Sequence, residues 1–470
     1  MFRTRAKQML LIFGIAFALR LAMCVWGADR VPPTADGAFY HVVAQRIAQG
    51  QGYTWLWPDG TVTYAAHYPV GYPAMMSVVY YLFGAVPLWA MFGNAFMGAS
   101  GVAAAYWLSA LALEKLRIKV HTQRSAFISA LVLALSPTLI LYTPALMTEA
   151  VVGALLAIAI CLALVYQNEV TQRHTRVLLF VGLALVLAIS CLVRPQSLIM
   201  AALLGLLLEK GIIRRLLSCV SLIVLTLAMV SPWTLRNCDR MDSCVFVSAN
   251  GGWNLLIGSY PEGNGAWVGI EGERVPEECR TIFSESGKDK CFSHAGRQRI
   301  MSAPLAWLKL VPAKLRATFD YSAAGVEHLY AAGAVNEAQK TPLQILEYAW
   351  QRAFAILTLV GAWFAASARR GNFWPTLGLV FGVICFLGAG AWLGWLIVVC
   401  LLLAVPGVHA NLPLVAAAAS IASTAAIHAV FFGAGRYSLP IWYVAAPVAA
   451  IGIVTLNQAR DRLRQRFLSN

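Results

Sequence analysis

The sequence predicts an all-α polytopic membrane protein, and three observations support this class. Of the 470 residues, 59% are hydrophobic and only 12% are charged, whereas soluble proteins carry about 25% charged residues. Apolar runs close to the roughly 20 residues that cross a bilayer recur along the chain. Basic residues gather beside alternate runs, as the positive-inside rule requires. Together these patterns exclude a soluble globular domain.

About twelve transmembrane helices follow from this alternation, with both termini in the cytoplasm. Arg3, Arg5 and Lys7 precede a first run that ends near Gly27, which predicts an uncleaved anchor. Further runs lie at about 87–113, 125–142, 149–166, 177–193, 195–209, 216–235, 346–367, 373–387, 390–405, 413–432 and 438–456.

The spans divide the chain into three predicted parts. Residues 1–235 form an N-terminal membrane module of about seven spans, with a first outer loop at 28–86. Residues 236–345 form an extracytoplasmic loop domain, and residues 346–470 form a C-terminal module of about five spans with a basic cytoplasmic tail. Residues 73–84 are too short to span the membrane and predict an interfacial helix. A helical pattern runs from about 294 to 318 in the large loop.

The formal net charge of +15 marks topology and not a nucleic-acid partner. Residues 236–352 hold 13 basic and 13 acidic residues, so the excess lies on the predicted cytoplasmic segments. A nucleic-acid surface needs basic residues gathered on one folded face. The sequence therefore predicts no nucleic-acid binding, and a lipid bilayer as the surroundings.

The ten cysteines fall into two groups. Six lie in or beside apolar spans, where a thiol packs as a small hydrophobe. The other four lie in the large loop, in a compartment that permits disulfides. We predict two local pairs, Cys238 with Cys244 and Cys279 with Cys291. A zinc site made of four thiolates is the alternative, although no Cys-x-x-Cys spacing occurs.

Two carboxylates at the outer membrane face are the first candidates for chemistry, because acids near spans are costly. Asp36 follows the first span, and Glu149 opens a later one. Each has a structural alternative of equal weight. Asp36 could only cap the helix that the pattern up to Gly50 predicts, and Thr148 or Glu149 could only open the next helix.

Three arginines without acidic neighbours in sequence end or begin apolar runs near the same face: Arg194, Arg236 and Arg436. A single arginine of this kind is usually an interfacial snorkeller. Three of them beside carboxylates indicate a site for an anion, since guanidinium groups suit phosphate. His67 and Tyr68 could serve the same site. Arg20, inside the first span, is a candidate structural partner of one of the carboxylates.

An ordered set of motifs resembles the GT-C glycosyltransferases, in the branch of protein O-mannosyltransferases and lipid A aminoarabinose transferases. The first outer loop carries an acid and a tyrosine (Asp36, Tyr40), then Ala44, Gly50, Gly52 and Tyr53, then His-Tyr-Pro-x-Gly-Tyr-Pro from His67 and Tyr-Leu-Phe-Gly from Tyr81. Later signatures follow in the same order, at 144–149, Arg194-Pro195, 232–237 and 436–440.

The resemblance implies an enzyme that moves a sugar from a polyprenyl-phosphate donor (undecaprenyl or decaprenyl) to an acceptor hydroxyl, with inversion. The acceptor would be a glycan, a glycolipid or a protein, and the active site of this bacterial inner-membrane enzyme would face the periplasm or exterior. The family roles fall on catalytic Asp36 and Glu149, with donor-phosphate contacts from Arg194, Arg236, Arg436 and His67 and substrate-lining Tyr40, Tyr68, Tyr72 and Tyr437.

Two departures from the family pattern concern the cofactor and the phosphate contact. Many members carry Asp-Glu where this chain has Asp36-Gly37, a departure that bears on the metal and on the acceptor arrangement. The resemblance therefore leaves a divalent cation (Mg or Mn) open and makes no cofactor certain. The aminoarabinose transferases have a lysine near the position of Tyr68.

Two other functions fit parts of the pattern. Twelve spans are common in secondary transporters or flippases of lipid-linked sugars, although no internal repeat is evident and the acids lie at the outer edge. An O-antigen-type ligase would also have outer loops and arginines. A non-catalytic scaffold is the remaining alternative.

Overall fold

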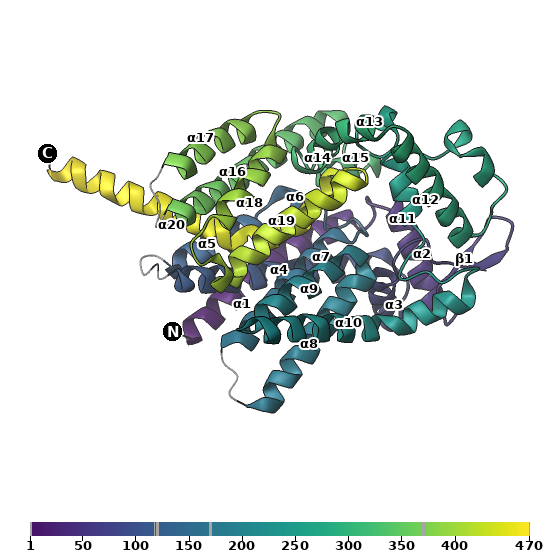
Figure 1. Cartoon of the computed structure of the whole chain (residues 1–470), viewed down its shortest axis with the longest axis horizontal. Coiled ribbons are helices and arrows are strands. Elements are labelled where there is room, and N and C mark those ends of the chain that lie inside the picture. The colour runs from purple at the N-terminus through teal and green to yellow at the C-terminus, as the bar shows by residue number, and fades with distance from the viewer. Residues whose placement is uncertain (1, 117, 119–121, 169–171, 368–372, 470) are drawn as a thin grey trace.

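The computed structural model describes residues 2–116, 118, 122–168, 172–367 and 373–469. It is a helical bundle, and the strands of the described residues are one antiparallel pair, β1 (Thr54–Leu56) and β2 (Val62–Tyr64). Figure 1 shows the two labelled termini at one end of the molecule and this hairpin at the other. The arrangement agrees with the predicted all-α polytopic class.

Within the part of the chain that the structure describes, eight helices are long and apolar enough to cross a membrane, which makes the chain a multi-pass membrane protein. They are α1 (Phe2–Gly27), α4 (Pro87–Lys115), α7 (Glu149–Asn168), α8 (Arg173–Val193), α10 (Ile212–Arg240), α16 (Glu337–Ser367), α19 (Leu412–Val430) and α20 (Leu439–Ser469).

The predicted count of twelve spans is not confirmed, because the other predicted runs form shorter helices. These are α5 (Thr122–Ala134), α6 (Pro137–Leu141), η1 (Pro195–Ser197) with α9 (Leu198–Leu208), α17 (Phe373–Leu387), and α18 (Ala391–Leu403) followed by η5 (Val408–Ala410). The run predicted at 125–142 is split because Pro137 cannot continue α5. Ser136 instead caps α6, its hydroxyl accepting from the Leu139 amide at 3.4 Å.

The first outer loop contains α2 (Asp36–Ala48), the hairpin and α3 (Gly71–Phe83). Helix α3 has 13 residues and packs against α2, α4 and α8, which fits the predicted interfacial helix. The hairpin was not predicted, although its Pro58-Asp59-Gly60 turn is a recognisable signal.

The large loop folds into short helices, which are α11 (Gly251–Ile257), η2 (Pro261–Gly263), η3 (Gly272–Arg274), η4 (Glu277–Cys279), α12 (Glu285–Ser302), α13 (Pro304–Lys309), α14 (Val311–Phe319) and α15 (Ala324–Ala331). The helical pattern predicted at 294–318 is therefore divided into three helices. The breaks precede Pro304 and Pro312, which favour the first turn of a helix. The three-part division of the chain stays a prediction.

Small residues allow α20 to lie in the centre of the bundle. The Tyr443 ring packs against Gly101 of α4 and Gly153 of α7, where a Cβ atom would collide with it. A Cβ atom at Gly361 of α16 would likewise collide with the Val448 carbonyl of α20. Such close approach is the usual way in which membrane helices gain packing energy. It fixes the N-terminal part of α20, which follows η6 (Gly435–Ser438).

The prediction that Arg20 pairs with a carboxylate is wrong. Its side chain is only 1% exposed, and its guanidinium donates to the Ala16 carbonyl at 3.1 Å and to the Leu133 and Ala134 carbonyls at 3.4 Å. The last two carbonyls belong to the C-terminal turn of α5, where a cation satisfies free carbonyls and opposes the helix dipole. Arg20 thus caps a helix that ends inside the bundle.

Both predicted disulfides are confirmed, Cys238–Cys244 and Cys279–Cys291, so these cysteines present no thiolates for zinc. The other six cysteines are free, and five of them are buried or half-buried. Cys400 is the exception to the predicted packing role, because it is exposed on α18.

Candidate active site

Asp36 is held by a tyrosine and an arginine and does not cap its helix. It is the first residue of α2, and no side-chain hydrogen bond caps that helix. Its Oδ1 accepts from the Tyr68 hydroxyl at 2.8 Å, and its Oδ2 accepts from Arg436 Nη2 at 2.9 Å. Ala35 before it has φ 50° and ψ −129°, a strained conformation for an alanine. Such strain concentrates at functional positions.

Glu149 is the buried carboxylate behind two arginines. Its side chain is 1% exposed. Its Oε1 accepts from Arg194 Nη2 and lies 3.6 Å from Arg436 Nε, while its Oε2 accepts from the Tyr142 hydroxyl at 3.2 Å. Glu149 begins α7, but its carboxylate is engaged by these three neighbours. Opening a helix therefore explains why Glu149 stands at the start of α7, but it does not explain these contacts of its carboxylate.

Arg194 and Arg436 both lie at helix ends beside the site. Arg194 is extended between α8 and η1, as expected for a residue before Pro195. Its Nε donates to the Thr148 hydroxyl at 2.9 Å. Arg436 lies in η6, and its Cζ is 5.3 Å from the centre of the Tyr437 ring; Arg194 Cζ is 5.1 Å from the same ring. Tyr437 thus lies against both cations.

These groups line a cavity of about 460 Å³ between the membrane helices and the two loops. The predicted residues that line it are Asp36, Tyr40, His67, Tyr68, Arg194, Arg436 and Tyr437. Three predicted site residues do not line it, namely Glu149, Tyr72 and Arg236. The structure thus brings seven of the ten predicted polar residues to one cavity, with Glu149 directly behind two of them.

The tyrosines form a packed layer beneath Asp36. The Tyr40 ring lies edge-on to Tyr68 and Tyr72, with ring centres 5.3 Å and 5.4 Å away. Tyr72 is buried, and its hydroxyl donates to Asn94 Oδ1 at 2.9 Å. Burial raises the pKa of Tyr40 well above its ordinary value, and the nearby Asp36 carboxylate raises it further. These phenols are therefore neutral hydrogen-bonding groups.

His67 faces the cavity as a neutral imidazole. Burial lowers its pKa from 6.5 to about 4, against a smaller opposing effect of the Asp36 carboxylate. Its ring lies edge-on to Tyr68 and Trp253. At neutral pH it can offer an anion a hydrogen bond and no positive charge.

Mild acid should destabilise the protein through this histidine. The unfolded state, with a His67 pKa of 6.5, binds a proton more readily than the folded state, with a pKa of about 4. Folding stability is therefore lost as pH falls from 6.5 to 4, and the loss at pH 5 is about 2 kcal/mol. We expect His67→Gln to flatten the decline of the melting temperature between pH 7 and 4.5. Part of the decline in melting temperature should remain in the His67→Gln protein, because burial also lowers the pKa of His328 to about 4.

Substitution of the exposed His409 by glutamine is the control and should leave the decline unchanged. Equal slopes for wild type and His67→Gln would contradict the assignment.

Arg236 holds the first outer loop and does not reach the cavity. Its guanidinium donates to the Ala65 carbonyl at 2.8 Å and to the Tyr53 carbonyl at 2.7 Å, and it stacks on Trp233 with Cζ 4.7 Å from the ring centre. The predicted phosphate contact has no geometric support, because these carbonyls occupy the donors. Arg236 instead positions the segment that carries His67 and Tyr68.

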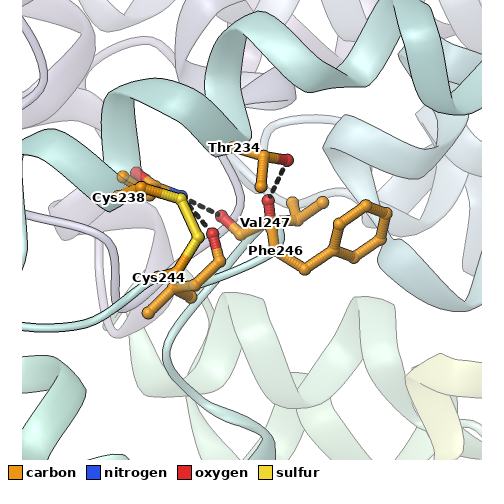
Figure 2. The surroundings of a disulfide bond; sticks show 7 residues. Thr234, Cys238, Cys244, Phe246 and Val247 are labelled. Carbon is orange, nitrogen blue, oxygen red and sulfur yellow. Dashed lines mark hydrogen bonds between the residues drawn. A yellow bond between two sulfur atoms is a disulfide. The ribbon is translucent and has the colours of Figure 1, made fainter.

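A brace of residues 245–249, closed by the Cys238–Cys244 disulfide, supports the same segment. Figure 2 shows the disulfide beside Thr234, whose hydroxyl donates to the Phe246 carbonyl at 2.8 Å. The side-chain amide of Asn237 donates to the Val245 and Val247 carbonyls. The Ala249 amide then donates to the Ala66 carbonyl at 2.7 Å. The brace links the outer end of α10 to the residue next to His67.

Replacing both Cys238 and Cys244 with serine should loosen this brace. A closed loop of this length contributes about 2 kcal/mol in the chain-entropy model, so the melting temperature should fall. Amide hydrogen exchange in residues 65–68 should become faster. The exposed Cys400→Ser is the control. Unchanged exchange in 65–68 would show that the brace does not depend on the disulfide.

The cavity also contains residues that sequence reasoning missed. Thr148 was noted only as a helix opener, and Gln196, Asn250, Trp253, Asn254, Trp267 and His428 were not singled out for the site. Polar and aromatic residues are common in an outer loop, so no pattern distinguished them. Gln196 carried the only local signal, since it lies two residues after Arg194.

The described residues include no group of three or more His, Cys, Asp or Glu side chains that could hold a metal ion. In the cavity, Asp36 already accepts from Arg436 and Tyr68. The residues present do not form a set of oxygen ligands for Mg or Mn. We therefore derive no step through a divalent cation.

No protein-family model and no curated protein matches the sequence. Several solved structures are similar to the chain at low identity. The archaeal oligosaccharyltransferase AglB from Archaeoglobus fulgidus, in complex with an inhibitory peptide and a dolichol-phosphate, is 12% identical, with a TM-score of 0.48 over 98% of this chain and 52% of that chain. This chain thus spans about half the length of AglB.

ArnT from Cupriavidus metallidurans, bound to undecaprenyl phosphate, is 14% identical, with a TM-score of 0.36 over 96% of this chain and 77% of that chain. At these identities and scores, the likeness carries no conclusion about what this chain binds or transfers.

Proposed function

We propose that the chain is a membrane glycosyltransferase that moves a sugar from a polyprenyl-phosphate donor to an acceptor hydroxyl on the extracytoplasmic face. The observation that carries the proposal is that one cavity is lined by a carboxylate, Asp36, and two arginines, Arg194 and Arg436. Asp36 can accept a proton, and Arg194 and Arg436 can bind a phosphate, all in one cavity. A proton acceptor beside cations that bind phosphate is what transfer from a phosphate-linked donor requires.

In the proposed reaction the acceptor oxygen attacks the anomeric carbon of the donor. A carbon–oxygen bond forms to the acceptor, and the bond from the anomeric carbon to the phosphate oxygen breaks. The acceptor proton moves to Asp36, and the bonding electrons leave with the polyprenyl phosphate. One displacement without a covalent intermediate inverts the anomeric configuration. The general base contributes about 10²–10⁴-fold to such a step.

Arg436 couples donor binding to the availability of the base. In the structure its Nη2 lies 2.9 Å from Asp36 Oδ2 and holds that carboxylate in an ion pair. A donor phosphate would compete for the same guanidinium, as forked donors favour phosphate oxygens. Transfer of Arg436 from Asp36 to the phosphate would free the carboxylate as a base. The same arginine would then stabilise the charge on the leaving group.

Glu149 is a positioning residue in this proposal. It contacts both arginines from behind the cavity, and Tyr142 holds its second oxygen. Tyr68 has a parallel role, because its hydroxyl donates to Asp36 Oδ1 and keeps the other oxygen directed toward the cavity. Tyr68 replaces a lysine of the aminoarabinose transferases, so no additional cation is supplied there.

The proposal is tested with purified protein in liposomes that contain polyprenyl phosphate bearing a radiolabelled sugar. We expect release of polyprenyl phosphate that depends on an added acceptor fraction from the cell envelope. The transporter alternative predicts movement of the intact donor across the bilayer without cleavage. Translocation with no cleavage under any acceptor fraction would contradict the proposed function.

A further inference from the structure

We propose that the large loop builds a subsite for the transferred sugar and that this subsite selects an uncharged sugar. This inference rests on the proposed function and adds the chemical class of the donor sugar. It follows from the side chains that the large loop contributes to the cavity and from the contacts that occupy the surrounding carboxylates.

The large loop contributes eight residues to the cavity, none of which carries a formal charge: Asn250, Gly251, Trp253, Asn254, Ile257, Trp267, Val268 and Ile270. The fully charged residues of the lining are Asp36, Arg194 and Arg436. All three are engaged in the ion-pair cluster: Asp36 begins α2 of the first outer loop, Arg194 follows α8, and Arg436 lies in η6 before α20. The cavity therefore combines a charged set from the membrane module with a neutral set from the loop.

The neutral set has the composition of a carbohydrate site. The carboxamides of Asn254 on α11 and Gln196 in η1 make no hydrogen bond to other described residues, so they are available to a ligand. A carboxamide donates and accepts, which suits hydroxyl groups. Trp253 and Trp267 add flat apolar faces, and Trp267 is 62% exposed. Apolar surface with a few polar groups is the usual make-up of a small-ligand pocket.

Helix α11 is fixed before any ligand arrives. The Asp289 carboxylate of α12 accepts from the Gly252 amide at 2.7 Å and the Trp253 amide at 3.1 Å. A Cβ atom at Gly252 would collide with the Asp289 carbonyl, so glycine permits this approach. The Trp253 ring packs edge-on to the buried Phe292, with ring centres 4.6 Å apart. Because α11 is held in this way, its carboxamide needs little reordering to bind a sugar.

A charged sugar would find no free partner among the described residues around the cavity. An ammonium group needs a carboxylate, but Asp289 accepts from α11 and Glu285 accepts from the Ala66 amide. Asp36, which the donor phosphate would release from Arg436, must take up the acceptor proton, so an ammonium bound there would occupy the base. A carboxylate on the sugar would have to compete with the donor phosphate for the two arginines. A buried charge without a partner is strongly unfavourable. Selection of an uncharged sugar follows.

The test compares lipids with one short polyprenyl phosphate and different head groups: no sugar, glucose, glucosamine or glucuronic acid. Binding to the full-length protein in detergent is measured by competition with fluorescent polyprenyl phosphate. We expect the glucose lipid to bind at least about tenfold more tightly than the sugar-free lipid. The glucosamine and glucuronic acid lipids should bind less than about twofold more tightly than the sugar-free lipid.

Asn254→Leu should abolish the gain for glucose, whereas Gln298→Leu, on the exposed face of α12, should keep it. Asn254→Asp should raise the affinity for the glucosamine lipid relative to the glucose lipid. An equal or larger gain for either charged sugar in wild type would overturn the inference. A sugar-free lipid that fails to bind, or binds wild type and Arg436→Gln equally, would instead count against the proposed function.

Discussion

Asp36→Asn should reduce sugar transfer at least about a hundredfold and leave the protein folded. Asparagine keeps the shape of the side chain and can still accept from Tyr68, but it cannot take up the acceptor proton. Loss of a general base costs about 10²–10⁴-fold. The measurement is the initial rate of polyprenyl phosphate release, with circular dichroism and the melting temperature as checks of folding.

Asp29→Asn is the matched control, because Asp29 is exposed and lies just before α2. It should keep wild-type rates. Binding of the sugar-free polyprenyl phosphate provides a second readout, since Asp36→Asn removes the group that competes for Arg436. We expect that affinity to stay constant or to increase. Near-normal turnover of the Asp36→Asn protein would remove Asp36 from the catalytic role.

Arg436→Gln should also greatly reduce the rate of sugar transfer, because the leaving phosphate loses a cation that stabilises its charge. Removal of one preorganised donor to a developing negative charge costs about 10²–10³-fold in kcat. Arg436→Lys should recover little, since an ammonium group cannot lie on the Asp36 and Glu149 carboxylates together as the guanidinium does at 2.9 Å and 3.6 Å. The rate of transfer and the affinity for polyprenyl phosphate are both measured.

Arg316→Gln is the control for this substitution. Arg316 is an exposed arginine of α14 whose Nε lies 3.6 Å from the Asp320 carboxylate, so it also has an acidic partner but lies outside the cavity lining. Its loss should change transfer by less than twofold. If Arg436→Gln were to bind polyprenyl phosphate as well as wild type, the phosphate contact of Arg436 would be contradicted, and with it the proposed function.

The sequence predicts the class of fold and most of the site because both depend on simple patterns. Alternating charge beside apolar runs placed Asp36 and Arg436 on the same membrane face, although they are 400 residues apart in the chain. The choice between a helix cap and a site residue could not be made. The direction of the Asp36 side chain depends on the unusual backbone at Ala35 and on Tyr68 and Arg436, which only the folded chain brings together.

Arg194 and Arg236 show the limit of local patterns. Both lie at the C-terminal end of an apolar run. In the structure, Arg194 meets Glu149, whereas Arg236 meets the carbonyls of Tyr53 and Ala65. Every residue has a backbone carbonyl, so the sequence could not indicate that two of them accept hydrogen bonds from Arg236. Asn254 could not be predicted either. In the sequence it is one of several amides in a polar loop, and only the position of α11 beside the cavity distinguishes it.

Arg20 has a consequence for how the chain enters the membrane. It lies seven residues before the end of α1, about 10 Å from that end. The carbonyls that it caps belong to Leu133 and Ala134, so more than a hundred residues must be synthesised before they exist. Until then, of these carbonyl acceptors, the Arg20 guanidinium has only the Ala16 carbonyl of its own helix, and an arginine inside a span costs about 2.5–3.5 kcal/mol on insertion scales. We therefore expect the burial of Arg20 to be completed only when α5 packs against α1, which ties the first helix to a segment made much later.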